Sequence, residues 1–99
     1  MKKVSRTIIE AQKFVLKSPD GKVKAILDAS SKEVTPRLVM YGKNGEVRLG
    51  IGILHDNVAL VQIYDKKEKA QVVIHVPGLG LPRIEFYDKK RNLVWAVPE

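Results

Sequence analysis

The chain has 99 residues, of which 44% are hydrophobic and 29% charged, a composition typical of one globular domain spanning residues 1–99. It contains no cysteine, which excludes disulfides, thiolate metal sites and a cysteine nucleophile, and favours a reducing compartment such as the cytoplasm. The net charge of +7 favours anionic partners but indicates nothing about the fold. No apolar run approaches the roughly 18–20 residues that a spanning helix needs, so we expect no membrane span.

The first two predicted hairpins cover about residues 10–27 and 37–53. In the first, residues 18–21 read Ser-Pro-Asp-Gly, where proline fixes φ and glycine takes the positive φ that ends a type I turn with a bulge. In the second, the tip contains Asn44-Gly45, and Asn-Gly is among the strongest short-range hairpin signals. Apolar and polar residues alternate on both sides of each turn, which predicts half-buried strands.

The third and fourth predicted hairpins cover about residues 58–76 and 82–97. Their tips, residues 65–68 and 88–92, carry Asp, Lys and Arg but no glycine. We assign turns there from their position in the repeat, with Asp or Asn side chains bonding to the nearby backbone.

The four hairpins repeat with a nearly fixed period, because the equivalent residues Leu16, Met40, Ile63 and Phe86 are 24, 23 and 23 positions apart. About eight short strands with regular turns predict an all-β meander of hairpins. This meander is expected to form a curled sheet, a sandwich or a barrel-like stack. The column through the four equivalent residues, completed by the return strands and Trp95, is expected to point inward.

Two segments carry a resemblance to known proteins. Residues 14–25 read Phe-Val-Leu-x-x-Pro-Asp-Gly-Lys-Val-Lys-Ala, and residues 84–95 read Ile-Glu-Phe-Tyr-Asp-Lys-Lys-x-Asn-Leu-Val-Trp. This pattern resembles bacterial β-hairpin-repeat proteins of unknown function, with units of the form F-x-L-x-D-x-x-G-x-x-R-A-x-L and L-x-L-Y-D-x-x-G-x-V-x-W. The resemblance covers most of residues 10–97 and departs at the two tips without glycine. It implies a self-associating or binding repeat module, and no enzymatic activity follows from it.

The second face of the predicted sheet is also partly apolar. Seven residues fall on it: Val15, Val39, Tyr41, Leu60, Tyr64, Val73 and Tyr87. A contiguous apolar patch usually marks an interface, so we expect these residues to form a contact in a homo-oligomer. Unpaired edge strands favour the same outcome, and a closed assembly such as a trimeric β-prism is one expected form. The tyrosines are alternatively a stacking surface for bases or sugar rings, or strand-end residues packed on neighbours.

The hairpin tips are rich in cations, and hairpins stacked in sequence would project all four tips from one side of the sheet. Eight basic residues are expected along that side: Lys22, Lys43, Arg48, Lys66, Lys67, Lys89, Lys90 and Arg91. Such a row would bind the phosphate or sulfate groups of nucleic acid or anionic glycan with salt-sensitive affinity. The alternative is that these cations keep the hairpins in solution and protect the sheet edges.

Catalysis is not indicated by any motif of the chain. His55 and His75 share no repeat position, and no third ligand has the spacing of a metal site. The Gly-x-Gly segments at residues 50–52 and 78–80 precede no helix start, and we interpret them as bulges or bends at strand ends. We therefore expect no enzymatic activity, no cofactor and no metal. The leading hypothesis is a non-enzymatic structural or interaction module, and the alternative is a polyanion-binding domain.

Overall fold

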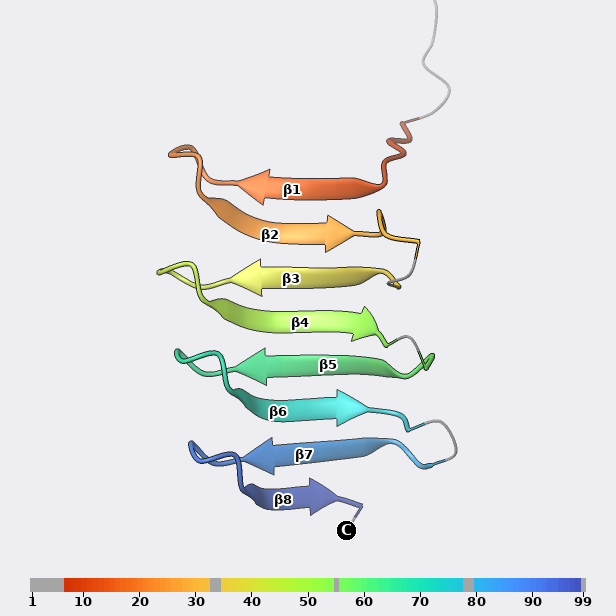
Figure 1. Ribbon diagram of the computed structural model, residues 1–99, viewed down its shortest axis with the longest axis vertical. Helices are drawn as coiled ribbons and strands as arrows, with labels where there is room; N and C mark the ends of the chain where they lie inside the picture. Colours follow the sequence, from red (N-terminus) through yellow and green to blue (C-terminus); the bar gives the residue numbers. More distant parts are fainter. Residues whose placement is uncertain (1–6, 33–34, 55, 78–79, 99) are drawn as a thin grey trace, which may run out of the picture.

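The structure is a computed structural model that describes residues 7–32, 35–54, 56–77 and 80–98. These residues form one eight-stranded sheet, without a helix, in which every strand pairs with the next one in sequence (Figure 1). The strands are β1 (Lys13–Lys17), β2 (Val23–Asp28), β3 (Arg37–Tyr41), β4 (Val47–Ile53), β5 (Ala59–Tyr64), β6 (Ala70–His75), β7 (Arg83–Tyr87) and β8 (Leu93–Val97). All seven ladders are antiparallel, so the predicted all-β meander of four hairpins is confirmed.

The sheet is a single open layer, with β1 and β8 as its two edges (Figure 1). It is therefore neither closed into a barrel nor folded back into a sandwich, and of the predicted forms it is consistent with the curled sheet. The four hairpin tips lie on one side of the sheet and the three connectors on the other. Residues 7–12 lie outside any strand. The part of the chain that is described contains no helix of the length and apolarity needed to cross a bilayer.

The four tips share one geometry, although only two contain glycine. Equivalent residues adopt positive φ: Gly21 (86°), Gly45 (83°), Glu68 (62°) and Arg91 (68°). Each closes a turn by donating its N–H to the carbonyl three residues earlier, and a register shift follows in each hairpin, as expected for a type I turn with a bulge. Asp88 supports the last tip, because its Oδ1 accepts from the N–H groups of Lys90 and Asn92, both at 2.9 Å.

Residues paired in register share a face of the sheet, so the ladders define which side chains lie together. Two complete rows on one face are entirely hydrophobic, and we call them the apolar face: Phe14, Leu27, Leu38, Ile51, Val61, Ile74, Ile84 and Val97, and Leu16, Ala25, Met40, Leu49, Ile63, Val72, Phe86 and Trp95. We call the opposite side the tyrosine face, because it carries Tyr41, Tyr64 and Tyr87.

The expected inward column is not buried in the single chain. Leu16 is 64% exposed and Trp95 47% exposed, and among the described residues only Ala25 and Val58 are buried. The physical reason is the single layer: one face of a sheet becomes a core only when a second layer covers it. The alternation identified the right residues for one face but not whether the chain itself covers that face.

Candidate functional site

The apolar face is the largest uncovered feature of the described chain. Eleven of its sixteen residues expose more than a third of their surface, and none of the sixteen carries a polar side chain. Phe86 and Trp95 contact each other on it, with ring centroids 4.8 Å apart. Contiguous exposed apolar patches larger than a few hundred Å² are rare on monomers in water and mark interaction sites.

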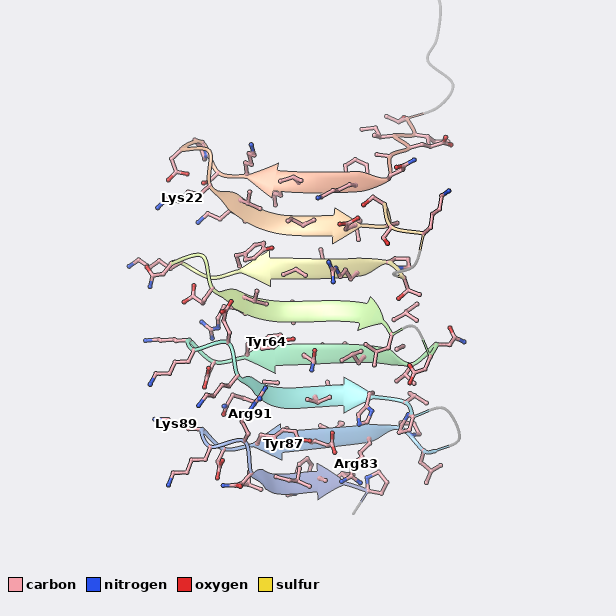
Figure 2. The ribbon with its side chains drawn as sticks, in the orientation of Figure 1. Lys22, Tyr64, Arg83, Tyr87, Lys89 and Arg91 are labelled. Atoms are coloured by element: carbon pink, nitrogen blue, oxygen red, sulfur yellow. The ribbon has the colours of Figure 1, made fainter. Side chains whose placement is uncertain are left out.

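The seven residues predicted to form the oligomer contact lie on the tyrosine face. Six are half-buried within the single chain, and only Val15, on the edge strand β1, is exposed at 44%. The three tyrosines occupy equivalent positions at the tip ends of alternate strands, as Figure 2 shows for Tyr64 and Tyr87. This face therefore satisfies much of its own surface with neighbours from the same chain.

Polar contacts between strands gather on the tyrosine face. The Arg48 Nε donates to the Tyr64 carbonyl oxygen at 2.8 Å, which ties the second hairpin to the third. The Tyr64 hydroxyl donates to Gln62 Oε1 at 2.7 Å, so its ring lies along its own strand. These contacts give the tyrosine face fixed partners that the apolar face does not have.

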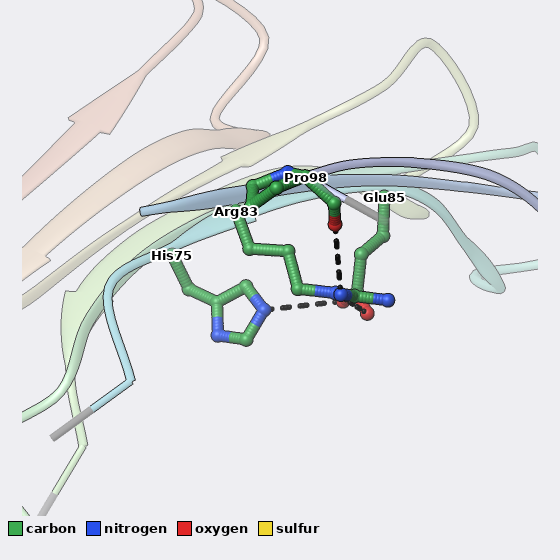
Figure 3. A network of polar contacts seen from close by, with 4 residues as sticks. All are labelled: His75, Arg83, Glu85 and Pro98. Carbon is green, nitrogen blue, oxygen red and sulfur yellow. Dashed lines mark hydrogen bonds and ion pairs between the residues drawn. The ribbon is translucent and has the colours of Figure 1, made fainter. Parts of the chain in front are cut away.

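A network on β6 and β7 ends at the C-terminal side of the sheet (Figure 3). Arg83 donates through Nε to Glu85 Oε2 at 2.8 Å and through Nη1 to the Pro98 carbonyl at 3.0 Å. His75 Nε2 lies 3.2 Å from the other Glu85 oxygen.

The Glu85 carboxylate is the centre of this network. The hydrogen bond from Arg83 is the main cause that holds the pKa of Glu85 below its ordinary value, and a hydrogen bond from Tyr87 acts in the same direction. Burial, followed by the neighbouring Glu85 charge, raises the pKa of Tyr87.

A shallow groove crosses the middle of the tyrosine face. Gly50 and Gly52 leave no side chain there, and the hollow of about 450 Å³ is lined by β3, β4 and β5, including Arg37 and Leu60. The prediction that these glycines form a bend at a strand end is wrong, because both lie within β4 and pair in regular register. A Cβ added to Gly50 would lie 3.6 Å from the Tyr64 ring, so that ring covers the glycine as a cross-strand neighbour.

The basic tips lie along one side of the sheet, where Figure 2 labels Lys22, Lys89 and Arg91. All eight predicted basic residues are in or next to the tips, on the side away from the connectors. Acidic residues interrupt the row. The N–H of Lys69 is the main cause that lowers the pKa of Asp65, and the N–H of Asn92 is the main cause for Asp88.

Two hollows between neighbouring tips differ in charge. Between the first and second hairpins, a hollow of about 600 Å³ is lined by Lys22, Lys24, Lys43 and Tyr41 and by no carboxylate among the described residues. Between the third and fourth hairpins, a hollow of about 430 Å³ contains Asp65 among its lysines. Carboxylates also lie beside the first hollow, because Asp20 Oδ1 accepts from the Lys22 N–H and Glu46 Oε1 accepts from the Asn44 N–H. The first hollow therefore differs from the other in its lining, and acidic side chains accompany the lysines at all four tips.

Three features were not found from the sequence: the positive φ of Glu68 and Arg91, the groove over β4, and the Glu85 network. The repeat alignment itself contained the signal for the first, because Glu68 and Arg91 align with Gly21 and Gly45. In the same alignment, the positions of the two β4 glycines are occupied by larger residues in the other hairpins. The network had no local signal, because His75 and Glu85 become neighbours only through the β6–β7 register.

No protein-family model matches the chain, and a search of curated proteins finds no similar one. The resemblance to bacterial hairpin-repeat proteins therefore stays a prediction. Within the described ranges, no three His, Asp or Glu side chains converge as metal ligands would. His55 lies outside the described residues, so the structure does not place it.

Proposed function

We propose that this protein is a self-associating structural module whose apolar face is the contact between copies. The observation that carries the proposal is the apolar face itself, two unbroken hydrophobic rows across all eight strands, which no other part of the described residues covers as a second layer. A sheet with one face of this kind is stable in water only when that face packs on another layer, about 10 Å away.

The size of the exposed surface supports an obligate contact. The chain exposes 8274 Å², whereas a globular monomer of 11.1 kDa exposes about 5,700 Å². In a dimer this excess of about 2,600 Å² per chain is about 5,200 Å² in total, at the upper end of the roughly 2,000–5,000 Å² or more that obligate interfaces bury. Packing of the apolar faces would remove part of this excess from water.

A second copy is the occupant that the apolar face fits best. Apart from the indole N–H of Trp95, the face carries no polar group that would select another partner, and an identical face is complementary to it in chemistry. The basic tips lie at the side of the sheet, so the net charge of +7 stays outside the contact. Two sheets facing each other, or three around a threefold axis as in a β-prism, both bury the face with closed symmetry.

The test is absolute mass by light scattering behind a sizing column, at roughly 50 mM and 500 mM salt. We expect a mass of two or more 11.1 kDa chains, with the same mass at both salt concentrations because an apolar contact is not screened. A monomer at both salt concentrations, with intact β structure by circular dichroism, would contradict the proposal.

A second candidate function is polyanion binding at the first two tips. The observation that favours it is the hollow lined by Lys22, Lys24 and Lys43, whose lining contains no carboxylate, although Asp20 lies beside it near Lys24. Tyr41 adds a ring on which a base or a sugar can stack. The anionic groups of a phosphate or sulfate polymer would then be held by the three ammonium groups.

Fluorescence anisotropy with a labelled single-stranded oligonucleotide, and competition by a sulfated glycan, would test this candidate. Changing all three lysines to Gln should weaken binding and lower the slope of log K against log salt by about 2–3. The matched control changes Lys66, Lys67 and Lys89 to Gln, around the hollow that also contains Asp65. Equal losses in the two triple variants would indicate diffuse attraction rather than a site, and no binding at low salt would remove the candidate.

A further inference from the structure

The unpaired edges of β1 and β8 are equivalent to edges that pair with each other elsewhere in the sheet. By the repeat, β8 is equivalent to β2, β4 and β6, and β1 is equivalent to β3, β5 and β7. Three junctions of this kind already exist, β2 with β3, β4 with β5 and β6 with β7, all antiparallel. Edge strands present unpaired N–H and C=O groups that favour pairing with another chain.

We infer that β8 of one copy pairs antiparallel with β1 of the next copy, as a fourth junction of the same kind. The inference rests on the proposed self-association and adds a second, directional contact to it. It makes the repeat continuous from one chain to the next, with both apolar faces on the same side of the joined sheet.

The register of the contact follows from the internal junctions. Ala25 pairs with Met40 where β2 meets β3, and the equivalent residues at the two edges are Trp95 and Leu16. Ile26 pairs with Val39, and the equivalents are Ala96 and Val15. We therefore expect Trp95 opposite Leu16 of the next copy on the apolar face, and Ala96 opposite Val15 of the next copy on the tyrosine face.

The charges of the two edges favour this pairing over a symmetric pairing of two β1 strands. β8 contains no charged residue, whereas β1 has Lys13 and Lys17 on either side of an apolar centre. A two-fold pair of β1 strands centred on Val15 would place Lys13 opposite Lys17 of the other copy, and like charges directly opposite are destabilising. β8 offers neither lysine a like charge, so β1 pairs with β8 without that repulsion.

The contact is heterologous, because it joins two different edges. Heterologous contacts produce a ring when the rotation between copies closes and a filament when it does not. The proposed face-to-face contact would then set how many such sheets lie side by side. The two contacts use different residues and can be tested separately.

The experiment uses the absence of cysteine from the natural chain. Val15→Cys and Ala96→Cys are made as separate single variants of the full chain, then oxidised alone and as an equal mixture. Directly opposed residues in an antiparallel pair have Cα atoms about 4.5–5.5 Å apart, within the range for a disulfide. The matched control is Ile26→Cys with Val39→Cys in one chain, the equivalent pair at an internal junction.

We expect the mixture to give disulfide-linked dimers at least fivefold more abundant than either single variant alone, while the control forms an internal disulfide. A chain carrying both Val15→Cys and Ala96→Cys should give a ladder of higher oligomers. The inference is overturned if the control oxidises and the mixture does not, or if a single variant alone links as well as the mixture. Light scattering of the unoxidised variants separates this failure from failure of the apolar-face contact.

Discussion

The apolar face and the tyrosine face use the same strands and the same alternation, but they differ in how much of their surface the chain itself covers. On the tyrosine face, long side chains reach across to neighbouring segments: Arg48 to the Tyr64 carbonyl and Arg83 to the Pro98 carbonyl. On the apolar face, aliphatic and aromatic side chains lie side by side, and eleven of sixteen remain exposed. A single sheet can therefore supply hydrogen-bond partners for polar side chains on one face, but it needs a second layer to bury an apolar face.

The largest change in assembled mass is expected when a charge is placed on the apolar face, and the control places the same charge on the tyrosine face. Ile63 and Gln62 are neighbours in β5 but point to opposite faces. Ile63→Lys would place an ammonium group in the proposed contact, at a cost on the order of 3 kcal/mol or more, and should lower the light-scattering mass to that of chains joined only by the β1–β8 edge contact. Gln62→Lys, as the matched control on the tyrosine face, should keep the mass of the natural protein.

A double variant separates the two faces further. Val39→Lys with Tyr64→Lys alters the surface that the sequence predicted as the oligomer contact. We expect this variant to keep its mass, because the proposed contact lies on the other face. If it becomes a monomer while Ile63→Lys stays assembled, the contact is on the tyrosine face and the proposed assignment is wrong.

The sequence predicted the strands and turns because those depend on neighbouring residues: the alternation defines the faces, and Pro-Asp-Gly and Asn-Gly define two tips. It did not predict which face stays uncovered. The apolar side chains of Val39, Leu60 and Val73 favoured an interface on the tyrosine face. All three are half-buried, because the ladder register places residues of neighbouring strands beside them. The groove over Gly50 was missed for the same reason, since the covering Tyr64 ring belongs to the next strand.

A smaller change, in the free energy of unfolding, is expected at the tips. Because the tips lie outside both faces, substitutions there test folding without altering either proposed contact surface. Arg91 has a φ of 68°, which glycine adopts at little cost, so Arg91→Gly should stabilise the protein by about 1 kcal/mol in urea unfolding. Glu68→Gly, at 62°, should gain less, because Glu68 Oε2 also accepts from the Val47 N–H at 2.9 Å. Gly21→Ala is the reverse control and should destabilise, since a Cβ there meets open space and only φ opposes it. Loss of stability in Arg91→Gly would contradict the turn assignment.

The smallest change in stability is expected from a substitution of Glu85, which affects the tyrosine face alone. Arg83 is the main cause of the lowered pKa of Glu85, so the ionised carboxylate stabilises the folded chain at pH values above its unfolded pKa of about 4.3. That contribution is lost as the pH falls through the lower pKa of the folded state. Glu85→Gln should therefore be less stable than the natural chain at pH 7, by on the order of 1 kcal/mol, and the difference should vanish in acid. Urea unfolding of both proteins at equal concentration measures the difference in stability. The contributions of the other carboxylates are the same in both proteins and do not affect this difference.

A difference that persists unchanged in acid would show that Glu85 acts by packing rather than charge. The mass should stay that of the natural assembly throughout, because the apolar face contains no group that titrates.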